Sequence, residues 1–284
     1  MTISAFAEWI GLPREAAALA KAHALPAAQQ AQKLALFEKD EPAFMAWLQA
    51  QAQPQPLALS LYLPYAAAQE KAFAGRGLSR QVYHDTMRDL ALWYKECVRQ
   101  TGAPGLVEWE WLAHSLKGRV LRLGRLQYQP GALEEALCVG AAFAAKMQAS
   151  AVQTAQVVLA AGTPVLEVHI PADGPLQHAA VIESFAQAKA VYAKDGLSLL
   201  HCTSWLLSPT LRTLLPEGSN IARFQEFFSI CGEKFSFRQA EERVFGAISD
   251  EVANYPEDTL LQKRLKQFLQ QGGRVGMGVG VRRL

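Results

Sequence analysis

Helical periodicity marks the first part of the chain. Residues 14–39 are rich in Ala, Gln, Lys and Leu, which are strong helix formers, and Pro26 interrupts them. We therefore expect two helices in this stretch. Apolar positions at helical spacing predict further helices over residues 41–52, 57–73 and 105–118.

One apolar stripe in this part is long and well bounded. It begins after Ser79, whose hydroxyl suits a helix N-cap, and it ends at Gly102, a residue typical of helix C-termini. Apolar residues between them recur at three- and four-residue spacings. The stretch predicts a helix with one buried face.

After residue 118 the pattern becomes an alternation of strands and helices. Short apolar runs predict strands over residues 119–130, 165–171, 197–207, 223–237 and 274–284. Helices are predicted over residues 178–194, 208–216, 237–248 and 259–273. The Ala-rich stretch 131–156 has a helical composition, although it lies between two predicted strands. We expect a helical domain over residues 1–118 and an α/β (α+β) domain over residues 119–284.

The strand VLEVHIP, residues 165–171, carries two polar side chains on one face. Side chains alternate along a strand, so Leu166 and Val168 point one way while Glu167 and His169 point the other. A carboxylate and an imidazole side by side on a short apolar strand form a candidate for proton transfer. The alternative is a polar layer of purely structural hydrogen bonds.

Composition narrows the class of protein. Half of the 284 residues are hydrophobic, which indicates a globular chain. A net charge of +2 gives no reason to expect nucleic acid as a partner. The apolar runs are shorter than a membrane span, and the N-terminal residues do not resemble a signal peptide. The four cysteines are widely spaced and no metal-binding histidine pattern occurs, so we expect no metal and a cytoplasmic location.

Five local sequences together resemble a bacterial two-domain family. They are HDTMRDLALWY (84–94), LGRLQY (123–128), VLEVHIPADGPL (165–176), CTSWLLSPTL (202–211) and SNIARFQEFF (219–228). That family joins a helical N-acyltransferase N-terminal domain to a GNAT-like C-terminal domain with a mixed sheet. The resemblance implies acyl transfer from acetyl-coenzyme A, or another acyl-coenzyme A, to an amine, without a tightly bound cofactor.

The resemblance also implies where coenzyme A would bind. In GNAT enzymes the pantetheine arm lies between two diverging central strands, here residues 164–170 and 197–206. The pyrophosphate lies on backbone amides where the following helix begins, near Leu176, and a helix N-terminus favours anions on physical grounds. The residues that this placement assigns to the coenzyme are Ile170, Gly174, Leu176 and Gln177.

The loop before this helix departs from the GNAT pattern R/Q-x-x-G-x-G/A. It reads PADGPLQHA (171–179), with one glycine and with Asp173, whose charge would oppose a phosphate. A second glycine-rich run, GGRVGMGVG (272–280), precedes no predicted helix. We interpret that run as a strand in which glycine permits a close approach of backbones.

The candidate chemistry gathers on the two central strands. Glu167 or His169 would act as the base, on the strand that often supplies the base in GNAT enzymes. On strand 197–207, His201 and Thr203 share one face, while Cys202 and Ser204 share the other. Ser204 is a candidate donor to an oxyanion or thiolate. Cys202 is either a nucleophile or, as is usual for buried cysteine, a small apolar residue.

Four further residues are candidates for binding the acceptor. Arg125 would recognise a carboxylate or pair with Glu167, and Gln127 shares its strand face. Trp205 would stack on a ligand or pack in the core, and Asn220 would orient substrate or satisfy a turn. The hypothesis that the resemblance implies is a GNAT-like N-acyltransferase acting on a small-molecule amine. The alternative is a GNAT-like binding or regulatory protein without catalytic activity.

Overall fold

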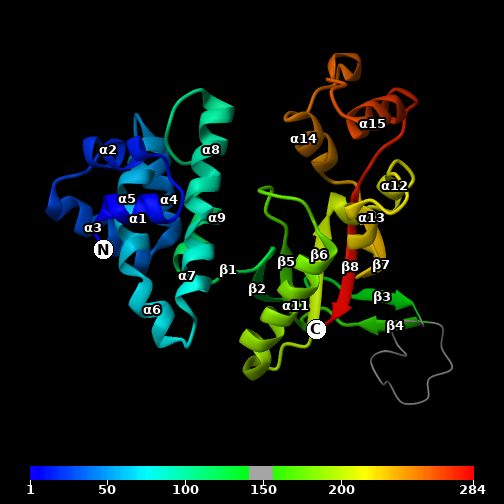
Figure 1. The fold of residues 1–284 in the computed structure, drawn as a ribbon, viewed down its shortest axis with the longest axis horizontal. Coiled ribbons are helices and arrows are strands. Elements are labelled where there is room, and N and C mark those ends of the chain that lie inside the picture. The colour runs from blue at the N-terminus through cyan, green and yellow to red at the C-terminus, as the bar shows by residue number, and fades with distance from the viewer. Residues whose placement is uncertain (141–155) are drawn as a thin grey trace. The chain divides into compact units, whose positions relative to one another are not determined.

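The chain folds into two compact units. The computed structural model describes residues 1–140 and 156–284, so the middle of the Ala-rich stretch lies outside the described residues. The first unit is Met1–Leu123 and the second is Gly124–Leu284 (Figure 1). Each unit has its own buried core, and each is described by itself below.

The first unit is helical. Its elements are α1 (Ile3–Trp9), α2 (Arg14–Ala22), α3 (Ala27–Lys39), α4 (Glu41–Gln49), α5 (Pro54–Ala68), α6 (Glu70–Gly75), α7 (Arg80–Met87), α8 (Asp89–Thr101), α9 (Trp109–Leu116) and a short strand, β1 (Leu121–Leu123). The break between α2 and α3 falls at Pro26, as the sequence predicts. The predicted helix from Ser79 to Gly102 is divided at Arg88 into α7 and α8, and Gly102 ends α8 in the left-handed conformation.

Helix α5 forms the centre of this unit. Nine of its residues are buried, including Leu59, Leu61, Tyr62 and Leu63. A helix that is apolar on all sides must be surrounded by other elements. Helices α1, α2, α3, α4, α6 and α9 all contact it.

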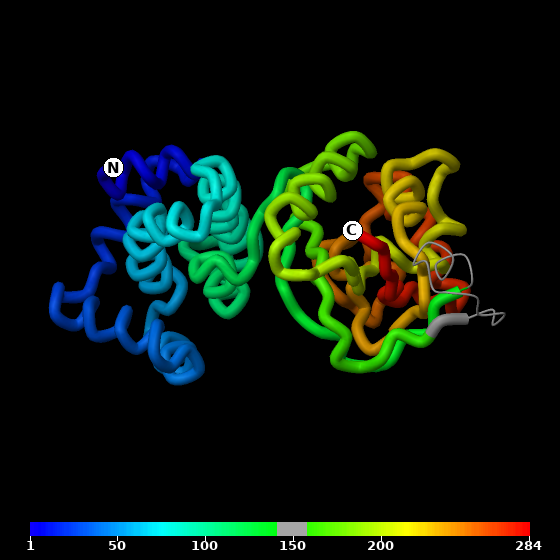
Figure 2. The backbone as a smooth tube through the Cα atoms, turned by 90° about the horizontal axis from the view of Figure 1, so that it is seen from below, coloured from blue at the N-terminus to red at the C-terminus, as the bar shows by residue number. Residues whose placement is uncertain are grey.

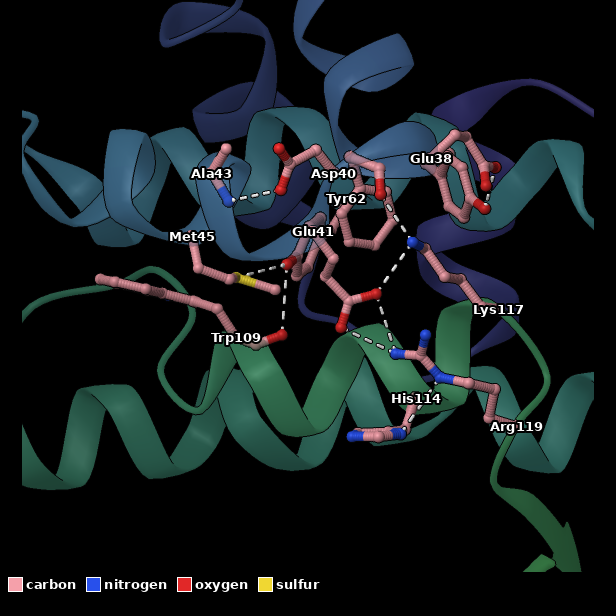
Figure 3. A network of polar contacts seen from close by, with 12 residues as sticks. Glu38, Asp40, Glu41, Ala43, Met45, Tyr62, Trp109, His114, Lys117 and Arg119 are labelled. Carbon is pink, nitrogen blue, oxygen red and sulfur yellow. Dashed lines mark hydrogen bonds and ion pairs between the residues drawn. The ribbon is translucent and has the colours of Figure 1, made fainter.

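A network of ionic contacts joins the start of α4 to the end of α9 (Figure 3). The Glu41 carboxylate lies 2.8 Å from Lys117 Nζ and 2.8 Å from Arg119 Nη2. Lys117 also donates to the carbonyl of Phe37, and Arg119 donates to His114 Nδ1. Burial acts to raise the pKa of Glu41, but the hydrogen bonds and charges of Arg119 and Lys117 outweigh burial and lower it. Burial of the His114 ring, together with the positive charge of Arg119 nearby, lowers the pKa of His114.

The second unit is built around a mixed sheet, as expected. Its strands are β2 (Leu126–Ala132), β3 (Leu137–Gly140), β4 (Gln156–Leu159), β5 (Pro164–His169), β6 (Leu199–Ser204), β7 (Ser229–Lys234) and β8 (Met277–Arg283). Five of them lie in the order β2-β5-β6-β8-β7, with β5 and β6 parallel and the other neighbours antiparallel. The C-terminal strand β8 is therefore internal to the sheet, and Figure 2 shows the C-terminus of the chain, in red, on the side of the second unit. Strands β3 and β4 form a separate antiparallel hairpin.

Helix α11 (His178–Tyr192) packs on one face of this sheet. Ser184 of α11 contacts the hydroxyl of Tyr128 at 2.8 Å, and Tyr192 lies 3.5 Å from the Tyr128 carbonyl. Phe185 of the same helix packs under the guanidinium of Arg282, 4.6 Å from the ring centroid. This face therefore carries Tyr128, Cys202 and Arg282, while the residues between them on each strand point to the opposite face.

The β3–β4 hairpin covers part of that opposite face. It does so through an apolar cluster, whose buried members are Leu133, Leu137, Val139, Leu159, Val165, Leu199, Val279 and Val281. Val165 and Leu199 lie at the beginning of β5 and β6. The polar residues that follow them lie on the same face as this cluster, which also includes Val281 and Val279, opposite His201 and Thr203 in the ladder with β8.

The remaining helices of the second unit follow β6. They are α12 (Pro209–Arg212), α13 (Asn220–Gln225), α14 (Gln239–Phe245) and α15 (Leu260–Gln270). The prediction of one strand over residues 223–237 is wrong in its first part, because Ser219 accepts from the amide of Ala222 and begins helix α13. Only residues 229–234 form a strand.

Two other predictions need correction. The expected strand over residues 119–130 is interrupted at Gly124, which has a φ of +66° and separates β1 from β2. The Ala-rich stretch 131–156 is not helical where it is described, since it holds the end of β2, the whole of β3 and the first residue of β4. Short strands with small residues are easily mistaken for helix when periodicity is weak.

The end of the glycine-rich run lies in strand β8, whereas residues 272–276 precede that strand. In the strand, glycine permits a close approach of backbones, as predicted. Gly278 lies opposite Ser204 in the ladder between β6 and β8. A Cβ atom at Gly278 would lie 2.0 Å from the carbonyl oxygen of Leu207, so the backbones approach too closely for any side chain. The run thus serves packing within the sheet.

The Glu41 network yields a prediction for stability. Because the folded-state pKa of Glu41 is lowered, its stabilising effect is present above the unfolded value of 4.5 and is lost as pH falls through the folded value. We expect Glu41→Gln to lower the free energy of unfolding at pH 7 by about 1.5 to 3 kcal/mol, since hydrogen bonds to charged groups are lost. The difference should shrink steadily as pH falls below 4.5.

Urea unfolding followed by tryptophan fluorescence measures this effect. Five of the six tryptophans, all except Trp205, lie in the first unit, so the signal reports mainly on that unit. The control is Glu70→Gln, which removes an ion pair between side chains that are 44% and 64% exposed. Such a pair contributes little. A Glu41 variant as stable as the control at pH 7 would contradict the prediction.

Candidate active site

The central strands β5 and β6 separate partway along their length. Their parallel ladder consists of two pairs, Leu166 with Leu200 and Glu167 with His201. On its outer side β5 is paired with β2 along all six of its residues, and β6 is paired with β8 along all six of its own. The carboxyl halves of β5 and β6 therefore make no ladder pairs with each other, although each strand is fully paired with its outer neighbour.

Polar side chains gather on one face where the strands separate. Gln127 and Gln129 of β2 stand opposite His169 and Glu167 of β5, respectively, and Glu167 stands opposite His201 of β6. Residues directly opposite one another in a ladder project to the same face. The face therefore presents two amides, a carboxylate and two imidazoles around the point of divergence.

Glu167 and His201 form the closest contact on this face. His201 Nδ1 lies 2.7 and 2.8 Å from the two carboxylate oxygens of Glu167. A carboxylate accepts hydrogen bonds, so Nδ1 carries the proton and Nε2 is the acceptor atom of the neutral ring. His201 Nε2 lies 3.5 Å from Thr203 Oγ1. Both side chains are largely buried, with 15% of His201 and 26% of Glu167 exposed.

His169 lies farther along β5, where the strands no longer pair. Its Nε2 is 3.2 Å from Gln129 Oε1, an acceptor, which leaves Nδ1 as the basic atom of the neutral ring. Gln127, opposite His169, is 2% exposed, and its Nε2 has no hydrogen-bond partner among the described residues. A buried donor without a partner is costly, and it is suited to a ligand oxygen.

The loop between β5 and α11 is held by Arg125. The guanidinium donates to three carbonyl oxygens, those of Pro171 at 2.9 Å, Gly174 at 2.5 Å and Pro175 at 3.0 Å. Arg125 Nη1 is also 3.9 Å from the carboxylate of Asp173. This arrangement partly balances the charge of Asp173, and it determines which way the peptide units of the loop point.

The amides of this loop point away from Arg125. The chain has no cis peptide bonds among its described residues, and in a trans peptide the N–H and C=O point in opposite directions. The amides of Ala172 and Leu176 therefore face away from the guanidinium. Gln177 is the N-cap of α11 without a capping side chain, and the first turn of the helix carries no acidic residue. The start of α11 is thus open to an anion.

The predicted coenzyme residues lie together on this loop. Ile170 follows directly after β5 and is partly exposed, while Gly174 and Gln177 are exposed and Leu176 is buried. The structure places Arg125 here too, with its guanidinium donating to carbonyl oxygens of the loop.

Three predicted site residues lie elsewhere. Ser204 is on the opposite face of β6 from His201, and its hydroxyl accepts from the amide of Leu206. Trp205 packs against a separate apolar cluster that includes Leu211 and Leu265. Asn220 is exposed in the first turn of α13. The structure does not bring these three together with Glu167 and His169.

Cys202 points away from the polar face and is completely buried. Burial raises the pKa of its thiol far above the usual range, and the charge of Glu167 adds to the effect. The thiolate needed for nucleophilic attack is therefore strongly disfavoured. This position favours the interpretation of Cys202 as a small apolar residue.

His201 is the residue of this face that sequence reasoning did not select. The alternation of the strand showed that His201 and Thr203 share a face, but that pattern does not reveal which residue of the neighbouring strand stands opposite. The ladder pair Glu167–His201 supplies that information. The available signal is that each of the two apolar central strands carries a polar residue near its middle, Glu167 in one and His201 in the other.

The described residues offer neither a metal site nor a membrane-spanning helix. Among the described residues, no group of three or more His, Cys, Asp or Glu side chains is placed to hold a metal ion. Within the same residues, no helix has both the length and the apolar character needed to cross a bilayer.

Family comparison agrees with the two-domain fold. The model of the GNAT-like C-terminal domain matches residues 120–282, and that of the N-acyltransferase N-terminal domain matches residues 1–118. The chain therefore belongs to the family that joins these two domains, as its local sequences suggest. A search of curated proteins finds no match.

Solved structures share the fold over the whole chain. A crystal structure of an acyltransferase in complex with decanoyl-CoA and teicoplanin is similar with a TM-score of 0.74 and 21% identity, covering 99% of this chain and 87% of that one. Another, in complex with CoA and 10C-teicoplanin, gives the same values. An acyltransferase in complex with decanoyl-CoA matches with a TM-score of 0.66 and 19% identity over 100% of both chains. At these identities the similarity establishes the fold.

Proposed function

We propose that this protein is an acyl-coenzyme A-dependent N-acyltransferase that acts on a small-molecule amine. The observation that carries the proposal is the short ladder between β5 and β6, which ends at Glu167 and His201 and leaves a polar face beside the divergence. The family supports acyl transfer as the class of reaction. Structures of the same fold bound to decanoyl-CoA support an acyl-coenzyme A as the donor.

The pantetheine arm would enter between the diverging halves of β5 and β6. Its amide groups can pair there with strand backbone groups that make no ladder contacts to each other. The thioester would then lie beside His169 and Gln127. The unpaired Nε2 of Gln127 is suited to donate to the thioester oxygen or to a substrate oxygen.

The pyrophosphate would lie on the amides at the start of α11. This loop has one glycine where GNAT loops usually have several, so another feature must direct its amides outward. Arg125 does so by binding the carbonyls of Pro171, Gly174 and Pro175. The guanidinium also offsets the charge of Asp173, which would otherwise repel the phosphates.

The reaction must remove two protons from the acceptor nitrogen. An ammonium ion has three protons and the amide product has one. One proton must be lost before the amine can attack the thioester carbon, and we assign its removal to His169 Nδ1. Glu167, the other candidate base, has its carboxylate bound by His201 Nδ1, so its direct action on substrate is disfavoured.

Binding and turnover test this function with the full chain. Acetyl-, octanoyl- and decanoyl-coenzyme A are added separately, and thermal unfolding is followed. Ligand at 100 times its Kd stabilises the folded protein by about 2.7 kcal/mol. Turnover is measured by mass spectrometry of free coenzyme A and acylated product with amino sugars, amino acids and aliphatic diamines as acceptors.

We expect His169→Ala to lower kcat by about 100-fold or more, because general base catalysis is lost.

The control for that variant is His23→Ala, which changes a histidine of the first unit at the end of α2. If none of the three donors shifts the unfolding temperature, the proposed function is wrong. Binding without turnover of any acceptor in the panel would favour a GNAT-like binding protein without catalytic activity. Turnover that is equal in wild type and His169→Ala would exclude His169 as the base.

A second prediction concerns Arg125 and the pyrophosphate. We expect Arg125→Gln to raise the Kd for acetyl-coenzyme A at least tenfold, because the loop amides lose their fixed direction. S-acetylpantetheine lacks the pyrophosphate, so its Kd should change less than twofold. Isothermal titration calorimetry measures both. Arg243→Gln, which alters an exposed arginine of α14, is the control. Equal losses of affinity for both ligands would show that Arg125 acts on the whole fold instead.

A further inference from the structure

The Glu167–His201 pair has a role that deepens the proposed function and rests on it. We propose that His201 is a second catalytic residue, and that Glu167 is the positioning residue that holds it in the active tautomer. His201 Nε2 would take the remaining proton from the acceptor nitrogen and deliver it to the sulfur of the departing coenzyme A.

The geometry of the pair supports this division of roles. Both oxygens of Glu167 lie within 2.8 Å of His201 Nδ1, so the carboxylate meets the ring nitrogen symmetrically. This bond fixes the proton on Nδ1 and presents Nε2 as the acceptor. When Nε2 takes a proton, the carboxylate beside it stabilises the positive charge on the ring, as in other carboxylate–histidine pairs.

The surroundings hold the pair in place. Glu167 and His201 are directly opposite each other in the last ladder pair, which limits their separation. Val281 of β8 stands opposite His201, and it belongs to the buried apolar cluster beneath the β3–β4 hairpin. Gly131 of β2 leaves room for Glu167, since a Cβ atom there would lie 3.3 Å from Glu167 Cγ. A substituted side chain at that position would press on the carboxylate.

The location of the pair suits the second of the two proton transfers, which follows attack of the amine on the thioester. His169 projects from β5 in the diverging region, and His201 projects from β6 at its base, so each wall of the opening supplies one imidazole. In the tetrahedral intermediate the C–N bond has formed, the nitrogen carries an excess proton and the C–S bond is still intact. His201 accepts that proton as the intermediate forms. It returns the proton to sulfur as the C–S bond breaks, which releases the thiol and the amide and leaves the ring neutral.

The two imidazoles differ in where the proton that each removes finally goes. The proton that His169 removes from the ammonium passes to solvent, whereas the proton that His201 removes ends on coenzyme A. The sum is one ammonium and one thioester converted to one amide, one thiol and one free proton. No oxidant, reductant or metal is needed.

A double-mutant cycle tests the pair. The variants are His201→Ala, Glu167→Gln and the combination of both, each assayed for kcat and for KM of the acyl donor and the acceptor. We expect His201→Ala to lower kcat by about 100-fold or more, with both KM values within threefold of wild type. Glu167→Gln should lower kcat by a smaller factor. In the His201→Ala background, Glu167→Gln should change kcat by less than twofold, because Glu167 acts through His201.

Chemical rescue distinguishes catalysis from structural support. Free imidazole should restore part of the lost kcat in His201→Ala and none in Glu167→Gln. The control is Glu183→Gln, an exposed carboxylate of α11, which should leave kcat unchanged. Unfolding temperature and acyl-coenzyme A affinity are measured for every variant. His201→Asn is the second variant in case the alanine variant fails to fold.

The outcomes separate this inference from the proposed function. Wild-type binding and turnover with full activity in His201→Ala and His201→Asn would overturn the role of His201 and leave the acyltransferase function intact. Multiplicative losses of kcat in the double mutant would show that Glu167 acts independently of His201, which contradicts the pair. A wild-type protein that binds no acyl-coenzyme A would overturn both proposals together.

Discussion

The pairing between β5 and β6 ends after Glu167 and His201, and the site depends on that ending. A parallel ladder that continued would bring Val168 and His169 against Cys202 and Thr203 and would close the sheet. Antiparallel strands on both outer sides keep β5 and β6 in position while their carboxyl halves separate. The opening is therefore a feature of a well-supported sheet, not of a frayed edge.

The two faces of this sheet are divided between stability and chemistry. On one face, α11 packs against Tyr128, and burial keeps the thiol of Cys202, which lies on the same face, protonated. On the other face, the β3–β4 hairpin covers the beginning of the strands with an apolar cluster. The polar residues lie farther along the same face of β5 and β6. Glu167 with His201 and His169 with Gln129 satisfy one another, while Gln127 retains a buried donor.

In this loop the side chain of Arg125 directs the backbone amides outward, a task that glycines usually perform in a phosphate-binding loop. Three carbonyls bound to one guanidinium fix the direction of the loop, and Asp173 lies within the field of the same charge. The sequence pattern alone counts this loop against coenzyme binding, because Gly174 is its single glycine. The contacts of a residue about 50 positions earlier in the chain change that interpretation.

Alternation and capping residues predict much of this fold, whereas long-range register escapes them. Glu167 and His169 were placed on one strand face because period 2 is local. Pro26, Ser79 and Gly102 mark helix boundaries by their own local preferences. The aromatic run after Ser219 predicts a strand, because strand propensity is a local signal, whereas the hydrogen bond that makes Ser219 a helix cap is seen only in the structure. His201 could not be matched to Glu167, because pairing between strands about 30 residues apart depends on the helix that connects them.

The central claim is that an acyl-coenzyme A arm occupies the opening between β5 and β6. A crystal structure of the chain with S-acetonyl-coenzyme A, a thioether analogue that cannot transfer its acyl group, tests it most directly. We expect the pantetheine amides to pair with the backbone of Val168–Ile170 and Cys202–Ser204, and the analogue's carbonyl to lie near His169 and His201. A complex in which β5 and β6 are joined by a continuous ladder of hydrogen bonds, with the pantetheine arm outside the sheet, would contradict the account.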